Sequence, residues 1–211
     1  MAAAARTSAD GVFINCPFDD AFAPIFRALI FAIHACGFQP RSALEVDDAG
    51  EARLDKLYGI IGQCRYGIHD LSRTELDEAN GLPRFNMPLE LGIFLGAKRY
   101  GGEAQSEKRL LILDVEQYRY QMFISDLAGM DIHAHHGNAA RAITETRNWL
   151  ANVSRRRLPS GPALVALHGR FLEDLPELAH FLGFAPKHVP YVDYENLVVG
   201  WLLKALPADN P

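Results

Sequence analysis

The residues of this chain best suited to chemistry are two acids, Asp70 and Glu90, which lie on either side of a polar loop. Asp70 ends the apolar segment YGIHD, and Glu90 lies near the start of the apolar segment MPLELGIFLGAK. A carboxylate among apolar residues costs stability unless it is paired or faces a cleft. Two carboxylates that face one cleft suit the cleavage of a glycosidic bond. One attacks or stabilises the oxocarbenium carbon, and the other moves protons or holds a sugar hydroxyl.

Polar and aromatic side chains flank both acids and are the candidates for binding a substrate. They come from the segment INCPFDD and from the loop that follows Asp70: Asn15, Phe18, Asp19, Asp20, Ser72, Arg73, Arg84, Phe85 and Asn86. Aromatic rings in loops can stack on a base, and arginines can bind a phosphate. These residues are therefore candidates for contacts with a base and with a phosphate.

Each of these residues also has a purely structural interpretation. Glu90 can be an acid that the dipole of its helix stabilises, and Asp70 can accept an Asx-type hydrogen bond from the turn at Ser72. One of Asp19 and Asp20 is expected to cap the next helix. We expect Glu90 to be more than a helix-start acid, because its helix is apolar nearly all round and should be buried.

The elements that must position these residues alternate along the chain. Apolar periodicity predicts strands at 11–16, 38–46, 66–71, 109–114 and 132–135, and helices at 21–36, 54–61, 87–98 and 138–153. Parallel neighbours need crossover connections, so the fold class is α/β, with a mostly parallel five-stranded flavodoxin-like (doubly wound) sheet and helices on both faces. Ligands bind such sheets at the carboxyl ends of the strands, where strand order reverses. Because neighbouring strand residues point to opposite faces, the side chain of His69 should point away from Asp70, and we do not expect it to be catalytic.

The chain divides into four parts. Residues 1–9 are expected to be a disordered tail, 10–154 the α/β domain, 155–162 a linker that contains three consecutive arginines, and 163–211 a C-terminal helical extension. Two helices at 163–182 and 192–206 should form a hairpin in this extension. Its apolar residues can bury against the domain or against a second copy, and the sequence does not choose between them.

Composition narrows the class of protein. A net charge of −5, a pI near 5.9 and 49% hydrophobic residues are typical of a globular protein without a nucleic-acid-binding surface. The three isolated cysteines favour a reducing compartment. No apolar run is long enough for a membrane span, so we expect a cytoplasmic protein. Metal-ligand spacings are absent, apart from a weak cluster at His133, His135 and His136, and we expect neither metal nor cofactor.

The segments IHDLS and LELGIFLGAK resemble the nucleoside 2-deoxyribosyltransferase family and its relatives in the TIR-like superfamily. In that family a strand ends in Asp, a polar loop follows, and the next helix carries a nucleophilic Glu ahead of small residues and a Lys. The matching residues here are Asp70, Glu90, Gly92, Gly96 and Lys98, and INCPFDD resembles the opening strand and its turn. The resemblance spans roughly residues 12–114. The stretch before Glu90 departs from the transferase pattern, because it reads RFNMPLE.

The resemblance implies an N-glycosidase that uses Glu90 and Asp70 on NAD or on a nucleoside or nucleotide, with hydrolysis and transfer both open. NAD would then be a substrate and not a cofactor. Relatives in this superfamily are often toxic effectors of bacterial immune systems, which implies a second copy or a defence-system protein as partner. The alternative from another class is a non-catalytic nucleotide-binding sensor or interaction domain that signals to a partner protein.

Overall fold

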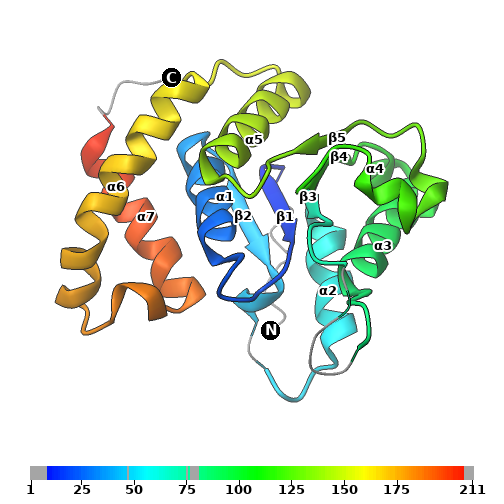
Figure 1. Cartoon of the computed structure of the whole chain (residues 1–211), viewed down its shortest axis with the longest axis horizontal. Coiled ribbons are helices and arrows are strands. Elements are labelled where there is room, and N and C mark those ends of the chain that lie inside the picture. The colour runs from blue at the N-terminus through cyan, green and yellow to red at the C-terminus, as the bar shows by residue number, and fades with distance from the viewer. Residues whose placement is uncertain (1–8, 47, 75, 77–80, 207–211) are drawn as a thin grey trace.

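The chain folds around one parallel sheet. The structure is a computed structural model, and it describes residues 9–46, 48–74, 76 and 81–206. The strands are β1 (Gly11–Asn15), β2 (Gln39–Ser42), β3 (Tyr66–Asp70), β4 (Arg109–Asp114) and β5 (Ile132–Ala134). All neighbours pair in parallel, in the order β2-β1-β3-β4-β5 (Figure 1). This is the flavodoxin-like order, and it confirms the predicted α/β class.

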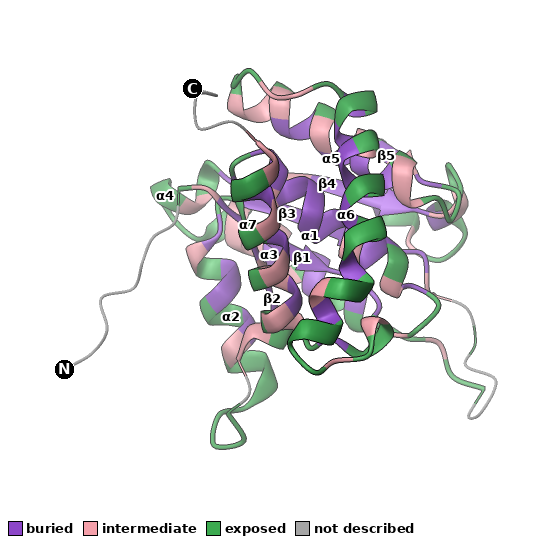
Figure 2. Ribbon diagram, turned by 90° about the vertical axis from the view of Figure 1, so that its left-hand side faces the viewer, coloured by how far each residue is buried: buried purple, intermediate pink, exposed green. Residues whose placement is uncertain are grey.

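Helices cover both faces of the sheet. They are α1 (Ala23–Ala35), α2 (Arg53–Gln63), α3 (Asn86–Tyr100), α4 (Glu103–Ser106), α5 (Ala139–Ser154), α6 (Gly161–Phe181) and α7 (Tyr191–Ala205). Short 3-10 turns follow β2 (η1, Ala43–Glu45) and β4 (η2, Arg119–Met122, and η3, Ser125–Leu127), and a fourth precedes α7 (η4, Pro186–His188). Val12 and Ile14 pack in the core with α1 and α5, whereas Phe13 packs with α2 and α3. Because successive strand residues point to opposite faces, β1 is buried on both sides (Figure 2).

The C-terminal helices pack against the domain itself. The ring of Phe31 in α1 lies 5.0 Å from His168, 5.4 Å from Phe171 and 6.2 Å from Trp201, measured between ring centroids. Figure 1 shows α6 and α7 stacked outside α1, on the side away from α3. The predicted helical hairpin is therefore present, and it shares the core of the sheet domain.

The segment between α5 and α6 is held in place by hydrogen bonds and a ring contact. The guanidinium of Arg147 donates to the carbonyl oxygens of Leu158, at 2.7 Å, and Pro159, at 2.5 Å. Arg156 lies over the ring of Phe38 at 4.7 Å. The linker predicted at 155–162 is also shorter, because α6 begins at Gly161.

Two sequence-based expectations are wrong in detail. The second strand was predicted to run to residue 46, but it ends at Ser42, whose side chain caps η1 in a reciprocal arrangement with Glu45. The helix that carries Glu90 was expected to be buried all round, but it lies on one face of the sheet and its outer side is exposed. Leu89 on that side is 56% exposed. The predicted tail at 1–9 lies outside the described residues, except for residue 9.

Gly67 in β3 is required by close packing. A Cβ atom there would lie 2.7 Å from the ring of Phe94 and 2.9 Å from Nε2 of His69. Gly67→Ala should therefore lower the free energy of unfolding by about 1 to 3 kcal/mol, as overpacking does in other cores. Urea denaturation measures this change. Gly92→Ala in α3 is the control, because a Cβ there meets nothing within 4 Å. It should leave stability unchanged or raise it, and equal losses in both variants would contradict the packing argument.

Candidate functional site

The candidate site lies at the carboxyl ends of β1 and β3, where the connections leave on opposite faces of the sheet. β1 leads to α1 on one face, and β3 leads through a long loop to α3 on the other. The side chain of Asn15, at the end of β1, donates from Nδ2 to the carbonyl oxygen of Met87 at 2.8 Å and to Nδ1 of His69 at 3.1 Å. These bonds fix the first turn of α3 against β1. Asn15 was predicted to bind substrate, but it is 2% exposed and its amide NH₂ is used within the protein.

Glu90 is a buried acid without a partner. It lies in the second turn of α3 and is 7% exposed. Its carboxylate makes no hydrogen bond or ion pair with any other described residue. Burial raises the pKa of Glu90 to about 7, although the charge of Arg53 opposes this shift. A carboxyl group with such a pKa exchanges its proton near neutral pH, which suits it to acid–base or nucleophilic work.

Cys16 shows that the acids of the site converge. Burial raises the pKa of the Cys16 thiol, and the carboxylates of Asp70, Glu90 and Asp19 raise it further. Each of these groups is therefore close enough to Cys16 to act on it electrostatically. The thiol is held protonated, so it is a poor nucleophile.

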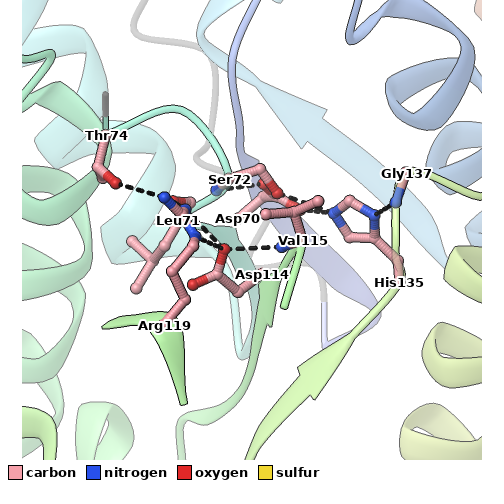
Figure 3. A network of polar contacts seen from close by, with 9 residues as sticks. All are labelled: Asp70, Leu71, Ser72, Thr74, Asp114, Val115, Arg119, His135 and Gly137. Carbon is pink, nitrogen blue, oxygen red and sulfur yellow. Dashed lines mark hydrogen bonds and ion pairs between the residues drawn. The ribbon is translucent and has the colours of Figure 1, made fainter. Parts of the chain in front are cut away.

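Asp70 is enclosed in a hydrogen-bond network and is 0% exposed (Figure 3). Its Oδ1 accepts from the backbone N–H of Ser72 at 2.9 Å, which confirms the Asx-type turn. Its Oδ2 lies 3.0 Å from Nε2 of His135, and Oγ of Ser72 lies 2.9 Å from the same nitrogen. Nδ1 of His135 accepts from the N–H of Gly137 at 3.0 Å, so the ring carries its proton on Nε2.

This tautomer decides what the network can do. In a Ser-His-Asp triad the serine and the aspartate bind opposite nitrogens of the histidine. Here Ser72 and Asp70 share Nε2 of His135, and Ser72 is itself only 7% exposed. The network therefore does not activate Ser72 as a nucleophile. It fixes the start of the loop after β3, and Asp70 orients that loop instead of facing the solvent.

Arg119 ties the same loop to the end of β4, and the sequence analysis did not identify it. Its Nε and Nη2 donate to Oδ1 of the fully buried Asp114 at 2.9 and 2.7 Å. Nη2 also donates to the carbonyl oxygen of Leu71 at 2.6 Å, and Nη1 to Oγ1 of Thr74 at 3.1 Å. Burial raises the pKa of Asp114, and the bonds from Arg119 counteract part of that shift. No local pattern in DVEQYR marks this pair.

Two arginines of the loop after β3 converge on Asp19. Arg73 lies 3.3 Å and Arg84 3.6 Å from its carboxylate oxygens. Asp19 also accepts from the N–H of Phe22 at 3.0 Å, in the turn before α1. The N-cap role predicted for Asp19 or Asp20 is wrong, because the N-cap position is Phe22 and it has no side-chain cap. Both arginines have side chains that are more than 40% exposed. The loops after β1 and β3 therefore meet through Asp19.

The remaining predicted residues lie at the surface of these loops. Phe18 and Phe85 are 41% and 67% exposed, as expected of rings that could stack on a base, and Asp20 and Asn86 are exposed as well. His69 contacts Phe94 of α3 at 4.9 Å between ring centroids, on the face that strand alternation predicts. Burial lowers its pKa to about 3, so the ring is neutral. Lys98 lies at the other end of α3 and bonds the carbonyl oxygens of Ser106 and Lys108.

Comparison of the chain with protein-family models, with curated proteins and with solved structures returned no match. Within the described part of the chain, no group of three or more His, Cys, Asp or Glu side chains is placed to hold a metal ion. In particular, His133 pairs with Glu145 at 2.6 Å. None of the described helices is both long and apolar enough to cross a membrane. The site is therefore interpreted from its own geometry.

The buried carboxylate of Glu90 should make stability depend on pH. Below pH 4.5 the group is neutral in both states, and it costs little. Between pH 4.5 and about 7 the carboxyl group is ionised in the unfolded chain but still protonated in the folded protein, so stability falls over this range and stays lower above it. Glu90→Gln should therefore be more stable than the wild type at pH 8, by at most about 3 kcal/mol, and similar to it at pH 4. Urea denaturation at both pH values measures this difference. The exposed Glu173→Gln is the control, and a gain that does not depend on pH would contradict the assignment.

The pair of Arg119 and Asp114 should behave as a buried ion pair. Arg119→Met leaves the Asp114 carboxylate uncompensated and should cost about 3 to 5 kcal/mol of unfolding free energy. The double variant Arg119→Met with Asp114→Leu removes both charges and should recover a large part of that loss. A double-mutant cycle from chemical denaturation measures the coupling. Simple additivity of the two single losses would show that the pair is not coupled.

Proposed function

We propose that this protein is an N-glycosidase of the deoxyribosyltransferase-like or TIR-like type, which cleaves the bond between a ribosyl group and its base. The observation that carries the proposal is the Glu90 carboxylate. It is buried and forms no hydrogen bond or ion pair with a described residue, and its pKa is near 7. Its helix begins beside the carboxyl end of β1, where Asn15 binds Met87. An acid kept in that state costs folding stability, which is expected where function requires it.

The reaction follows from what one carboxylate can do in a dry site. The bond between C1′ and the base nitrogen breaks with its electron pair going to the base. Ionised Glu90 stabilises the oxocarbenium carbon or bonds to it through a carboxylate oxygen. Water, or a second acceptor, then takes the ribosyl group and gives up a proton. The low dielectric around Glu90 strengthens its attraction for the positive carbon.

The surrounding side chains fit a phosphate-bearing substrate. Arg73 and Arg84 are held near Asp19 but remain exposed, so a phosphate can compete for their guanidinium groups. Phe18 and Phe85 offer exposed rings for stacking. We therefore favour NAD or a nucleotide over a free nucleoside. We assign Asp70 a different role from the one the sequence predicts: its side chain is 0% exposed and positions the loop.

A second candidate function is a nucleotide-binding sensor that performs no chemistry. The specific observation in its favour is the enclosure of Asp70, which leaves Glu90 without a second open carboxylate from β3. A sensor would bind a nucleotide at the arginines and pass the change in the loop to a partner protein. The two functions differ in whether a free base is released.

Glu90→Gln should reduce base release from NAD or nucleotides by at least about a thousandfold, because the ionised carboxylate acts in the transition state. Purified protein is incubated with NAD, nucleosides and nucleotides, and free base is measured by chromatography. Glu173→Gln should retain full activity. In the wild type, kcat/KM should rise with pH through about 7 as Glu90 ionises.

The oligomeric state is measured beside the assay, so that an assembly requirement is detected. Base release by the wild type that persists unchanged in Glu90→Gln would refute the catalytic role. Nucleotide binding with no base release from any assembly would favour the sensor.

A further inference from the structure

A cavity lies on the α1 side of the loop after β1, away from α3. It has a volume of about 150 Å³ and is bounded by that loop, by α1, by η1 and by the start of α7. Neither Glu90 nor Asp70 lines it, and Val189, Tyr191 and Tyr194 of the C-terminal extension do. An apolar cavity of about 150 Å³ in another protein encloses a benzene ring. The space therefore fits a single aromatic ring.

The walls of the cavity are aromatic and well fixed. The rings of Phe26 and Tyr191 stack with centroids 5.8 Å apart and planes 15° from parallel. Phe18 meets Phe26 edge to face at 5.3 Å, and it is 41% exposed. Arg27 donates to the carbonyl oxygens of Pro186 and Lys187 at 2.9 and 3.0 Å, which holds η4 against α1. The cavity is therefore preformed, as small-molecule sites usually are.

Three polar groups of the lining have no hydrogen-bond partner within the described part of the chain: the hydroxyls of Tyr191 and Tyr194 and the carboxylate of Asp20. Tyr194 is 1% exposed, and its buried hydroxyl makes no hydrogen bond. Asp20 lies exposed at the rim, and it forms no hydrogen bond or ion pair. Asp19, by contrast, is already paired with Arg73 and Arg84. Both tyrosine hydroxyls are closed to solvent, so of these groups Asp20 at the rim is the one that a ligand in the cavity can reach.

We propose that this cavity is a second binding site, for a planar aromatic ring that bears a hydrogen-bond-donating or cationic nitrogen. The ring lies against Phe26 and Tyr191, and its nitrogen substituent meets Asp20. Free nucleobases and pyridine carboxamides belong to this chemical class. The site does not depend on the chemistry of Glu90. Because Asp19 borders the cavity and binds both loop arginines, an occupant contacts the residue that joins the loops after β1 and β3.

The test uses two ligands of the same shape and opposite charge. Benzamidine should bind the full-length protein saturably in isothermal titration calorimetry, and benzoate should bind at least about tenfold more weakly because the Asp20 carboxylate repels it. Nicotinamide, which is neutral, should bind as well. Each titration is repeated with Glu90→Gln, which leaves the cavity intact and should retain full affinity. Loss of binding in that variant would place the ligand at Glu90 and refute the second site.

Variants of the lining localise the ligand. Asp20→Asn should weaken benzamidine about tenfold, as the loss of one charge-assisted hydrogen bond does. Tyr194→Phe should leave both affinities unchanged, because the buried hydroxyl does not reach the cavity. The matched controls are Asp55→Asn at the exposed start of α2 and Tyr66→Phe in β3, which should bind normally. Ala23→Leu fills the cavity and should abolish binding of both ligands. Binding that neither Asp20→Asn nor Ala23→Leu changes, or equal affinity for benzoate and benzamidine, would overturn the proposal.

Discussion

The side chain of Asn15 makes the contact on which the arrangement of this protein most depends. It joins the end of β1 to the first turn of α3 through Met87 and to β3 through His69. Those three elements come from distant parts of the chain, and two hydrogen bonds from one buried amide join them at the switch point. Nδ1 of His69 accepts from Asn15, so the ring carries its proton on Nε2, which has no hydrogen-bond partner among the described residues. Glu90 follows Met87 by less than one helical turn, so Asn15 also fixes where that carboxylate lies.

The loop after β3 is restrained at several points, and the restraints differ in kind. Hydrogen bonds from His135 hold Asp70 and Ser72 at its start, and the guanidinium of Arg119 binds Leu71 and Thr74 just beyond. At the far end Arg84 reaches Asp19. The first set is buried and persistent, whereas the ion pairs at Asp19 are exposed and weaker. A ligand that binds the arginines would therefore act on the exposed restraint first.

The C-terminal helices have two roles in the structure. They complete the core around Phe31, and they also supply the wall of the cavity beside Asp20. Asp19 and Asp20 are adjacent in the sequence, yet Asp19 pairs with the arginines of the loop after β3, whereas Asp20 lies exposed at the rim of the cavity. The two side chains have different surroundings because of the turn into α1, in which Asp19 binds the N–H of Phe22.

The sequence by itself determined the alternation of strands and helices, the parallel sheet, and the location of Glu90 in a helix beside the end of β3. Those features follow from local periodicity and from the need for crossovers between parallel strands. Tertiary structure alone decided the state of each polar group. Asp70 is enclosed because His135, 65 residues away, reaches it. Arg119 compensates the charge of Asp114, which is fully buried. The Glu90 carboxylate feels the charge of Arg53 but forms no ion pair with a described residue. Such contacts depend on which strands become neighbours, and a one-dimensional pattern carries no information about them.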